Sequence, residues 1–146
     1  MIFRLFIDKD KPEEVCATVH ERTALIDEIE QLVLQIGTTD RIAAHADDDI
    51  LMLRVDRIEC FVTECERTYA IYADGKRYLV KRRLCELEQI LPGRFERIGK
   101  SALANMEAVT RFKVHLSGAV DAVFKSGYAE CISRRCFAEL KRRYGL

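Results

Sequence analysis

FERIGKSALANMEAVTRFKVHLSGAVDAVFKSGYAECISRR, residues 95–135, is the stretch that decides the fold. From Ala108 onward apolar residues alternate with polar ones, and Ser117-Gly118 and Ser126-Gly127 interrupt the alternation. Alternation with a period of two between turn residues is typical of antiparallel strands. The stretch therefore predicts a β meander with strands at 108–116, 119–125 and 128–132.

Two short polar segments lie at the ends of this alternating run, Gly99-Lys100-Ser101 before it and Ser133-Arg134-Arg135 after it. A rigid meander would hold them as neighbouring loops. Each combines cationic side chains with a hydroxyl group. Such groups bind phosphates and, through Arg or Lys, the O6 and N7 edge of guanine. By their local chemistry alone the two segments predict a basic surface and no more.

One helix is predicted before this stretch and another at its end. A short amphipathic helix ends at Pro92-Gly93, and its apolar residues recur at helical spacing. They are Leu84, Leu87, Ile90 and Leu91. The last helix begins at the N-cap Ser133 and would bury three side chains. They are Phe137, Leu140 and Tyr144.

The middle of the chain predicts two hairpins and one further strand. Asp74-Gly75 is a strong signal for a type I′ turn between strands at 67–73 and 76–81. A strand at 57–63 precedes them. Strands at 41–46 and 50–55 would flank the acidic tripeptide Asp47-Asp48-Asp49. The EF-hand spacing of alternate acids is missing there, which favours a solvated hairpin tip over a Mg²⁺ or Ca²⁺ site.

The first third of the chain predicts two strands, at 2–7 and 14–20, and one helix. Over residues 23–36 the apolar residues recur with a period of 3.6, with Thr23 as a plausible N-cap and Gly37 as a plausible stop. The apolar stripe of this helix would cover a sheet or form a dimer contact. We treat residues 1–45 as an extension and residues 46–146 as the main domain.

Charge is distributed unevenly along the chain, although the formal net charge is zero. Residues 1–56 hold 6 Lys or Arg and 13 Asp or Glu, a difference of −7, whereas residues 57–146 hold 18 and 11, a difference of +7. Such asymmetry suggests that only the second half meets a polyanion. No apolar run approaches the ~20 residues of a membrane span, and the N-terminal apolar stretch is too short for a signal peptide. We expect a cytoplasmic protein.

Six cysteines and three histidines are the remaining candidates for chemistry. The closest cysteine spacings are C-x4-C, at Cys60/Cys65 and Cys131/Cys136, and not the C-x2-C of zinc sites. We expect free thiols, no metal and no cofactor. The histidines lack a flanking catalytic signature, and no P-loop or G-x-G-x-x-G motif occurs, so we expect no enzyme.

The order of these features resembles the LytTR DNA-binding domain of bacterial response regulators. The matching pieces cover roughly the last two thirds of the chain; no single piece is specific, but the ordered set is. They are Val55–Glu59, Tyr69–Tyr72, Leu84–Glu88, Leu91-Pro92, Phe95–Ile98, Lys100-Ser101 with Asn105, Ser126-Gly127 and Ile132–Arg135. The resemblance implies an α+β, predominantly β, fold of antiparallel strands with short helices. The first half is too short for a receiver domain, which implies a stand-alone regulator.

Members of this family read successive major grooves with loops at one edge of the β fold, and their roles can be carried over by position. The base-contacting roles fall on Arg67 or Thr68, on Lys100, and on Arg134 or Arg135. Either arginine of the last pair would make a bidentate contact to guanine, and Lys100 would reach guanine or a phosphate. Ser101, together with the backbone N–H groups at the helix start at Ser133, would bind phosphate oxygens. Asn105 would shape a loop.

The resemblance implies a sequence-specific transcriptional regulator that binds double-stranded DNA as a homodimer on paired repeats. Stand-alone members often lie beside genes for small membrane proteins, which makes a membrane protein a candidate partner. Two other functions stay open. One is an interaction module whose basic face meets an acidic protein. The other is a redox-responsive thiol protein that uses Cys131 and Cys136, which flank the second basic segment.

Overall fold

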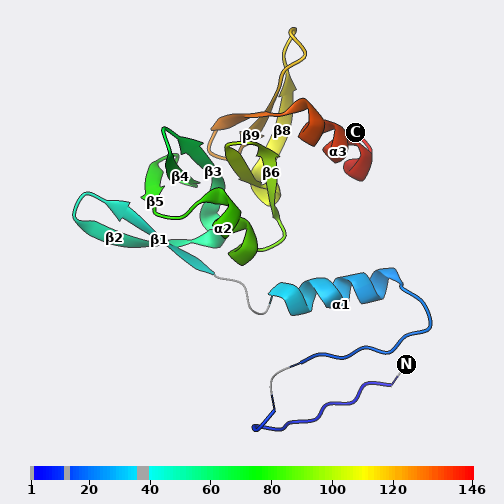
Figure 1. Ribbon diagram of the computed structural model, residues 1–146. Helices are drawn as coiled ribbons and strands as arrows, with labels where there is room; N and C mark the ends of the chain where they lie inside the picture. Colours follow the sequence, from blue (N-terminus) through cyan, green and yellow to red (C-terminus); the bar gives the residue numbers. More distant parts are fainter. Residues whose placement is uncertain (1, 12–13, 36–39) are drawn as a thin grey trace. The chain divides into compact units, whose positions relative to one another are not determined.

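The computed structural model describes residues 2–11, 14–35 and 40–146, and it divides into an N-terminal unit, 1–36, and a C-terminal unit, 37–146 (Figure 1). The first strand, β1 (Arg41–Ala46), pairs with β2 (Asp49–Arg54) and so belongs to the C-terminal unit. The division therefore falls nine residues before the sequence-based boundary at 45/46. Asp47 and Asp48 form the exposed turn of this hairpin, which confirms the solvated tip.

Seven strands of the C-terminal unit form one antiparallel sheet with the order β2-β1-β5-β4-β3-β7-β6. The strands not yet named are β3 (Ile58–Glu64), β4 (Arg67–Tyr72), β5 (Arg77–Val80), β6 (Phe95–Gly99) and β7 (Ala102–Asn105). The predicted meander forms a separate three-stranded sheet. Its strands are β8 (Val109–Val114), β9 (Val120–Phe124) and β10 (Ala129–Ile132). Two 3-10 turns, η1 (Val55–Arg57) and η2 (Met106–Ala108), precede β3 and β8.

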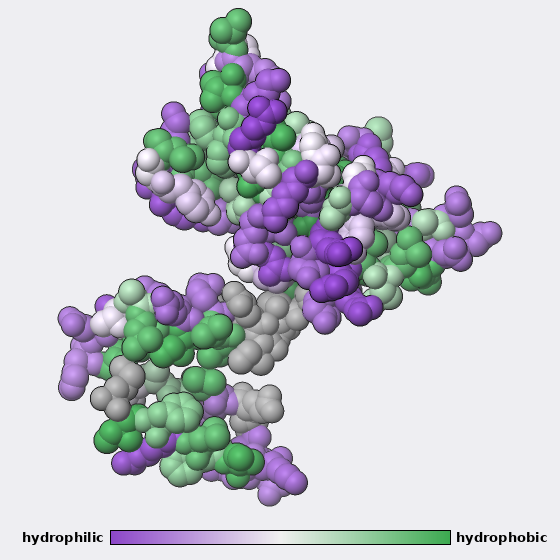
Figure 2. Space-filling view, turned by 180° about the vertical axis from the view of Figure 1, so that it is seen from behind, coloured by the Kyte–Doolittle hydropathy of each residue, from purple (hydrophilic) through white to green (hydrophobic). Residues whose placement is uncertain are grey.

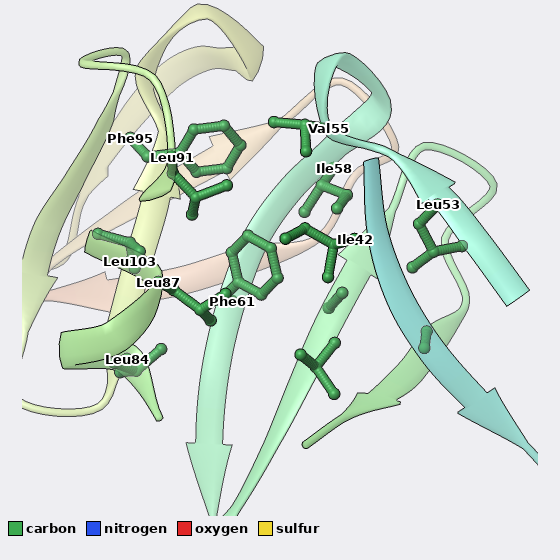
Figure 3. Close-up of a cluster of buried hydrophobic side chains, with 13 residues drawn as sticks. Ile42, Leu53, Val55, Ile58, Phe61, Leu84, Leu87, Leu91, Phe95 and Leu103 are labelled. Atoms are coloured by element: carbon green, nitrogen blue, oxygen red, sulfur yellow. The ribbon is translucent and has the colours of Figure 1, made fainter. Parts of the chain in front are cut away.

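Each face of the seven-stranded sheet carries its own core, because side chains alternate along β3. Phe61 is fully buried at the centre of one core, which α2 (Leu84–Ile90) covers with Leu84 and Leu87 (Figure 3). Cys60 and Val62 point to the other face, where the three-stranded sheet contributes Phe124 to the second core. β3 is thus buried on both faces, which explains its almost continuous apolar sequence.

The last helix, α3 (Arg134–Tyr144), begins where the sequence predicts it. The Ser133 Oγ accepts a hydrogen bond from the Cys136 N–H at 3.2 Å, and Gly145 ends the helix in the left-handed region with φ of 67°. Leu140 is buried, as expected. Tyr144 is 54% exposed, which corrects the expectation that it is buried.

Two expectations about local structure were wrong. The sequence predicts a loop shaped by Asn105, but residues 102–105 form β7, a fully buried strand between β3 and β6. Asp74-Gly75 is not a type I′ turn, because only Gly75 has a positive φ; its N–H donates to the Tyr72 C=O at 2.8 Å. The two-residue turn with two positive φ angles lies instead at Cys65 and Glu66, with φ of 49° and 64°.

The N-terminal unit contains α1 (Ala24–Gln35) and no strand among its described residues. The strands expected at 2–7 and 14–20 are therefore wrong for the described part of these ranges, since their apolar alternation finds no hydrogen-bonded partner strand. The expected helix end at Ile36 and Gly37 lies outside the described residues. Hydrophobic side chains gather on the surface of this unit (Figure 2), and Phe3, Phe6 and Ile7 are each more than 80% exposed. In the described part of the chain, no helix is long and apolar enough to cross a membrane.

Candidate nucleic-acid interface

Three segments carry the predicted DNA contacts: the first holds Arg67 and Thr68, the second Lys100 and Ser101, and the third Ser133, Arg134 and Arg135. The first two meet at one end of the seven-stranded sheet. At this end, which we call the basic end, β3, β5 and β6 finish and β4 and β7 begin. The last pair of the β3–β4 ladder is Glu64 with Arg67, and the Thr63 N–H donates to the Ser101 C=O at 2.8 Å. The antiparallel register therefore brings the turn before Arg67 beside the turn that carries Lys100 and Ser101.

A backbone hydrogen bond places the third segment, Ser133 to Arg135, beside the second. The Ser133 N–H donates to the Ile98 C=O at 2.8 Å, two residues before Lys100. The Ser133 hydroxyl oxygen caps α3, and a hydroxyl group that accepts a hydrogen bond can still donate its own hydrogen to a phosphate oxygen. Arg134 and Arg135 form the first turn of α3 and are both exposed. The structure thus brings together all three segments singled out from the sequence.

The cations of these segments are free to meet a ligand. Arg67, Lys100 and Arg134 are exposed, and among the described residues none of them forms a salt bridge. Arg135 is 91% exposed and lies 3.8 Å from Glu139, a surface contact that contributes little. Thr68 is only 6% exposed, so of the two residues considered in the first segment Arg67 is the accessible one.

Two carboxylates lie in the β3–β4 turn and limit what it can bind. Glu64 forms a salt bridge with Arg77 at 3.1 Å, which offsets its charge. Glu66 is exposed at the tip, and in the described chain it has no such partner. Because a free carboxylate repels phosphate, this turn is better suited to the edges of bases than to the backbone of a nucleic acid.

Arg97 fixes the turn that carries Lys100, a role that the sequence did not reveal. Its guanidinium donates to Glu88 Oε1 of α2 at 3.0 Å and to the Lys100 C=O at 2.7 Å. One side chain therefore joins the helix on one face of the sheet to a loop at the basic end. The only sequence signal was the presence of Arg97 in the segment Phe95–Ile98.

Glu88→Ala is expected to weaken the preference for a specific duplex by about 1 kcal/mol, because Arg97 and the Lys100 turn lose their support. The measurement is fluorescence anisotropy on a preferred and a scrambled duplex. The substitution removes a negative charge, so a purely electrostatic role would strengthen binding to both duplexes instead. Glu86→Ala, on an exposed residue of the same helix that bonds no residue of this turn, is the matched control.

Glu59 anchors the three-stranded sheet to the larger one. It is 2% exposed, and its two carboxylate oxygens accept hydrogen bonds from the Ser126 N–H, at 3.0 Å, and from the Ser126 hydroxyl. Ser126 and Gly127 form the turn from which β10 runs to Ser133. A buried carboxylate thus holds the far end of the strand that delivers the third basic segment.

Asn105 has a structural role, as expected, but it lies at the end of β7 and not in a loop. Its Nδ2 donates to the Ile58 C=O at 3.0 Å, and its Oδ1 accepts from the Glu107 N–H at 3.1 Å, capping η2. The side chain is 2% exposed. Asn105 therefore shapes the end of β7 and has no access to a ligand.

The cysteines near the third segment are free thiols. Cys131 is exposed in β10, and Cys136 is half-buried in the first turn of α3. Among the described residues, no group of three or more His, Cys, Asp or Glu side chains is placed to hold a metal ion. Burial raises the pKa of the Cys60 thiol, the largest effect on that group, and this favours its neutral form.

Comparison with known proteins gives consistent matches. A family model described as the LytTr DNA-binding domain matches residues 48–145. Over its full length the chain is 24% identical to an uncharacterized HTH-type transcriptional regulator of Staphylococcus aureus strain NCTC 8325 / PS 47, and 25% identical to one of strain MSSA476; the alignments cover 99% of each relative. A solved LytTr DNA-binding domain from Bacillus cereus has a similar fold, with a TM-score of 0.66 and 15% identity, over 74% of this chain and 99% of that chain.

Proposed function

The chain belongs to the LytTR family of DNA-binding domains, and from this premise we propose that it is a transcriptional regulator that reads duplex DNA with the loops of its basic end. The observation that carries the proposal is the meeting of three cationic segments, from distant parts of the chain, at one end of a rigid sheet. Loops held by a sheet keep their spacing, as the reading of successive grooves requires.

Each segment has a distinct part in the proposed contact. Arg134 or Arg135 makes the bidentate contact to guanine O6 and N7. Lys100 contacts guanine or a phosphate. Arg67 contacts the edge of a base, because the neighbouring Glu66 repels phosphate. Ser101 and Ser133 donate hydroxyl hydrogens to phosphate oxygens. Thr68, buried beneath this surface, supports the turn and makes no contact of its own.

Reading by loops is favoured over reading by a helix-turn-helix, although the Staphylococcus aureus relatives are named as HTH-type regulators. Along the described part of the chain, a strand always separates one α-helix from the next. A helix-turn-helix needs two helices joined by a short turn. The proposal therefore gives the contacts to the turns and to the first turn of α3.

The test is fluorescence anisotropy of the protein on its own upstream DNA and on a scrambled duplex, each over a salt series. We expect tighter binding to the upstream DNA and a steep loss of affinity with salt. Equal, weak binding to both duplexes would contradict sequence-specific reading.

We also propose that two copies act together and that α1 supplies the contact between them. Leu25 and Leu32 are 48% and 62% exposed on its apolar stripe, with Ile26, Ile29 and Val33 only partly covered. Burying such residues is worth roughly 1.5–3 kcal/mol for each fully covered side chain.

Sedimentation of the free protein tests this contact. We expect a dimer for the native chain and for Gln31→Glu, the control on the neighbouring residue, but a monomer for Leu32→Glu. A native chain that stays strictly monomeric at high concentration would refute the pairing. If Leu32→Glu still formed a dimer, the contact between the two copies would not be made by α1.

A further inference from the structure

Three consecutive cations, Lys81, Arg82 and Arg83, lie at the basic end and were not among the predicted site residues. They join β5 to α2, and all three are exposed. Within the described structure none of them has a carboxylate within salt-bridge distance. Their mutual repulsion is therefore not relieved by any acidic side chain placed beside them.

The β4–β5 ladder places this segment beside the β3–β4 turn that precedes Arg67, which we call the first reading turn; the turn that carries Lys100 is the second. Its last pair is Thr68 with Val80, so the residues just beyond it are Arg67 on one strand and Lys81 on the other. Neighbouring strands lie about 5 Å apart. The backbone of the tripeptide thus begins directly beside the proposed base-reading arginine.

The other end of the segment is fixed as firmly. Leu84 follows it immediately and is 5% exposed in the core under α2. From α2, Glu88 holds Arg97, which in turn holds the Lys100 turn. The tripeptide is therefore connected to the first reading turn through the β4–β5 ladder, and to the second through α2, Glu88 and Arg97.

The requirements of the fold do not explain these cations. Arg83 occupies the N-cap position of α2, where Ser, Thr, Asp or Asn is preferred, and it makes no side-chain cap hydrogen bond. Positive charges near a helix N-terminus also oppose the helix dipole. Residues that break a local rule with no compensating contact tend to serve function.

We propose that Lys81, Arg82 and Arg83 form a phosphate-contacting segment that grips the DNA backbone beside the groove read by Arg67. This inference rests on the proposed DNA-binding function and assigns a second class of contact to the same end of the sheet. The segment increases the affinity and its salt dependence, and it fixes the position of the protein on the duplex. It adds no base preference, since contacts between cations and phosphates do not depend on the sequence of the bases.

The test compares two double variants with the same loss of charge. Lys81→Ala/Arg82→Ala removes one lysine and one arginine from the segment. Arg57→Ala/Lys76→Ala removes the same pair from the opposite end of the sheet, where both residues are exposed and the Ala73 N–H donates to the Arg57 C=O. Anisotropy is recorded on the upstream and scrambled duplexes over a salt series, and far-UV circular dichroism checks the fold.

The segment variant is expected to lose affinity for both duplexes by the same factor. Its slope of log affinity against log salt should become less steep by about 2, roughly 0.9 for each phosphate that is no longer neutralised. The ratio of the affinities for the two duplexes should stay unchanged. The opposite-end variant should keep the native slope, and Lys81→Arg/Arg82→Lys should restore it.

Equal slopes in the two alanine variants would overturn the phosphate contact while leaving sequence-specific binding intact. A changed ratio between the duplexes in the segment variant would also overturn it, since that result indicates base reading. If the native protein itself bound neither duplex in a salt-dependent way, the proposed function would fail, and this inference would fail with it.

Discussion

Arg135→Ala is expected to remove most of the preference of the protein for its own upstream DNA, a loss of roughly 1–3 kcal/mol. A bidentate contact to guanine O6 and N7 has this value because a wrong base cannot offer two acceptors in the same geometry. The substitution should cost little stability, since the Arg135 side chain is 91% exposed and its one salt bridge among the described residues is the 3.8 Å contact with Glu139. Anisotropy on upstream and scrambled duplexes gives the result.

Arg134→Ala and Arg142→Ala complete this experiment. Arg134 is the neighbouring candidate, so if it reads the guanine, its substitution and not that of Arg135 removes the preference. Arg142 is an exposed arginine in the last turn of the same helix, and Arg142→Ala should change nothing beyond a small uniform effect of charge. Three variants with equal ratios between the duplexes would contradict reading by α3.

The cationic side chains of the candidate site were predictable because each belongs to a short motif in a fixed order along the chain. It was also predictable in outline that these side chains come together. Consecutive antiparallel strands run in opposite directions, so every second connection lies at the same end of the sheet. The sequence did not show which of Arg67 and Thr68 is accessible to DNA, because this depends on which residue of β4 faces the core. A shift of one residue exchanges the two faces of a strand.

Contacts between distant residues were the part that the sequence did not reveal. Asn105 could be assigned as a loop-forming residue from its own chemistry, yet its partner Ile58 lies 47 residues away. The register of the β6–β7 pair shifts between Arg97 and Gly99, next to the hydrogen bond from Arg97 to the Lys100 C=O, and no local sequence pattern predicted either feature. Ala102–Asn105 was not predicted as a strand, and it forms one where β3 and β6 pair with it on either side.

Glu59→Ala is expected to lower the free energy of unfolding by roughly 2–3 kcal/mol, because it leaves a charge-assisted pair of hydrogen bonds unmade. The Ser126 N–H loses its side-chain acceptor, and the turn before β10 is released from β3. Glu59→Gln should cost less, since an amide oxygen can still accept from the N–H and its amino group can donate to the Ser126 hydroxyl. Urea denaturation measures all three proteins.

The same substitution links stability to DNA reading. β10 runs from the turn held by Glu59 to Ser133, so loosening that turn should let the α3 start shift away from the Lys100 turn. The preference for upstream DNA should therefore fall in Glu59→Ala even at temperatures where the protein stays folded. Glu107→Ala, on an exposed glutamate of the same unit, should leave stability within about 0.5 kcal/mol and the ratio of the affinities for the two duplexes unchanged. If Glu59→Ala lost stability but kept the full preference, the three-stranded sheet would hold the third segment without this anchor.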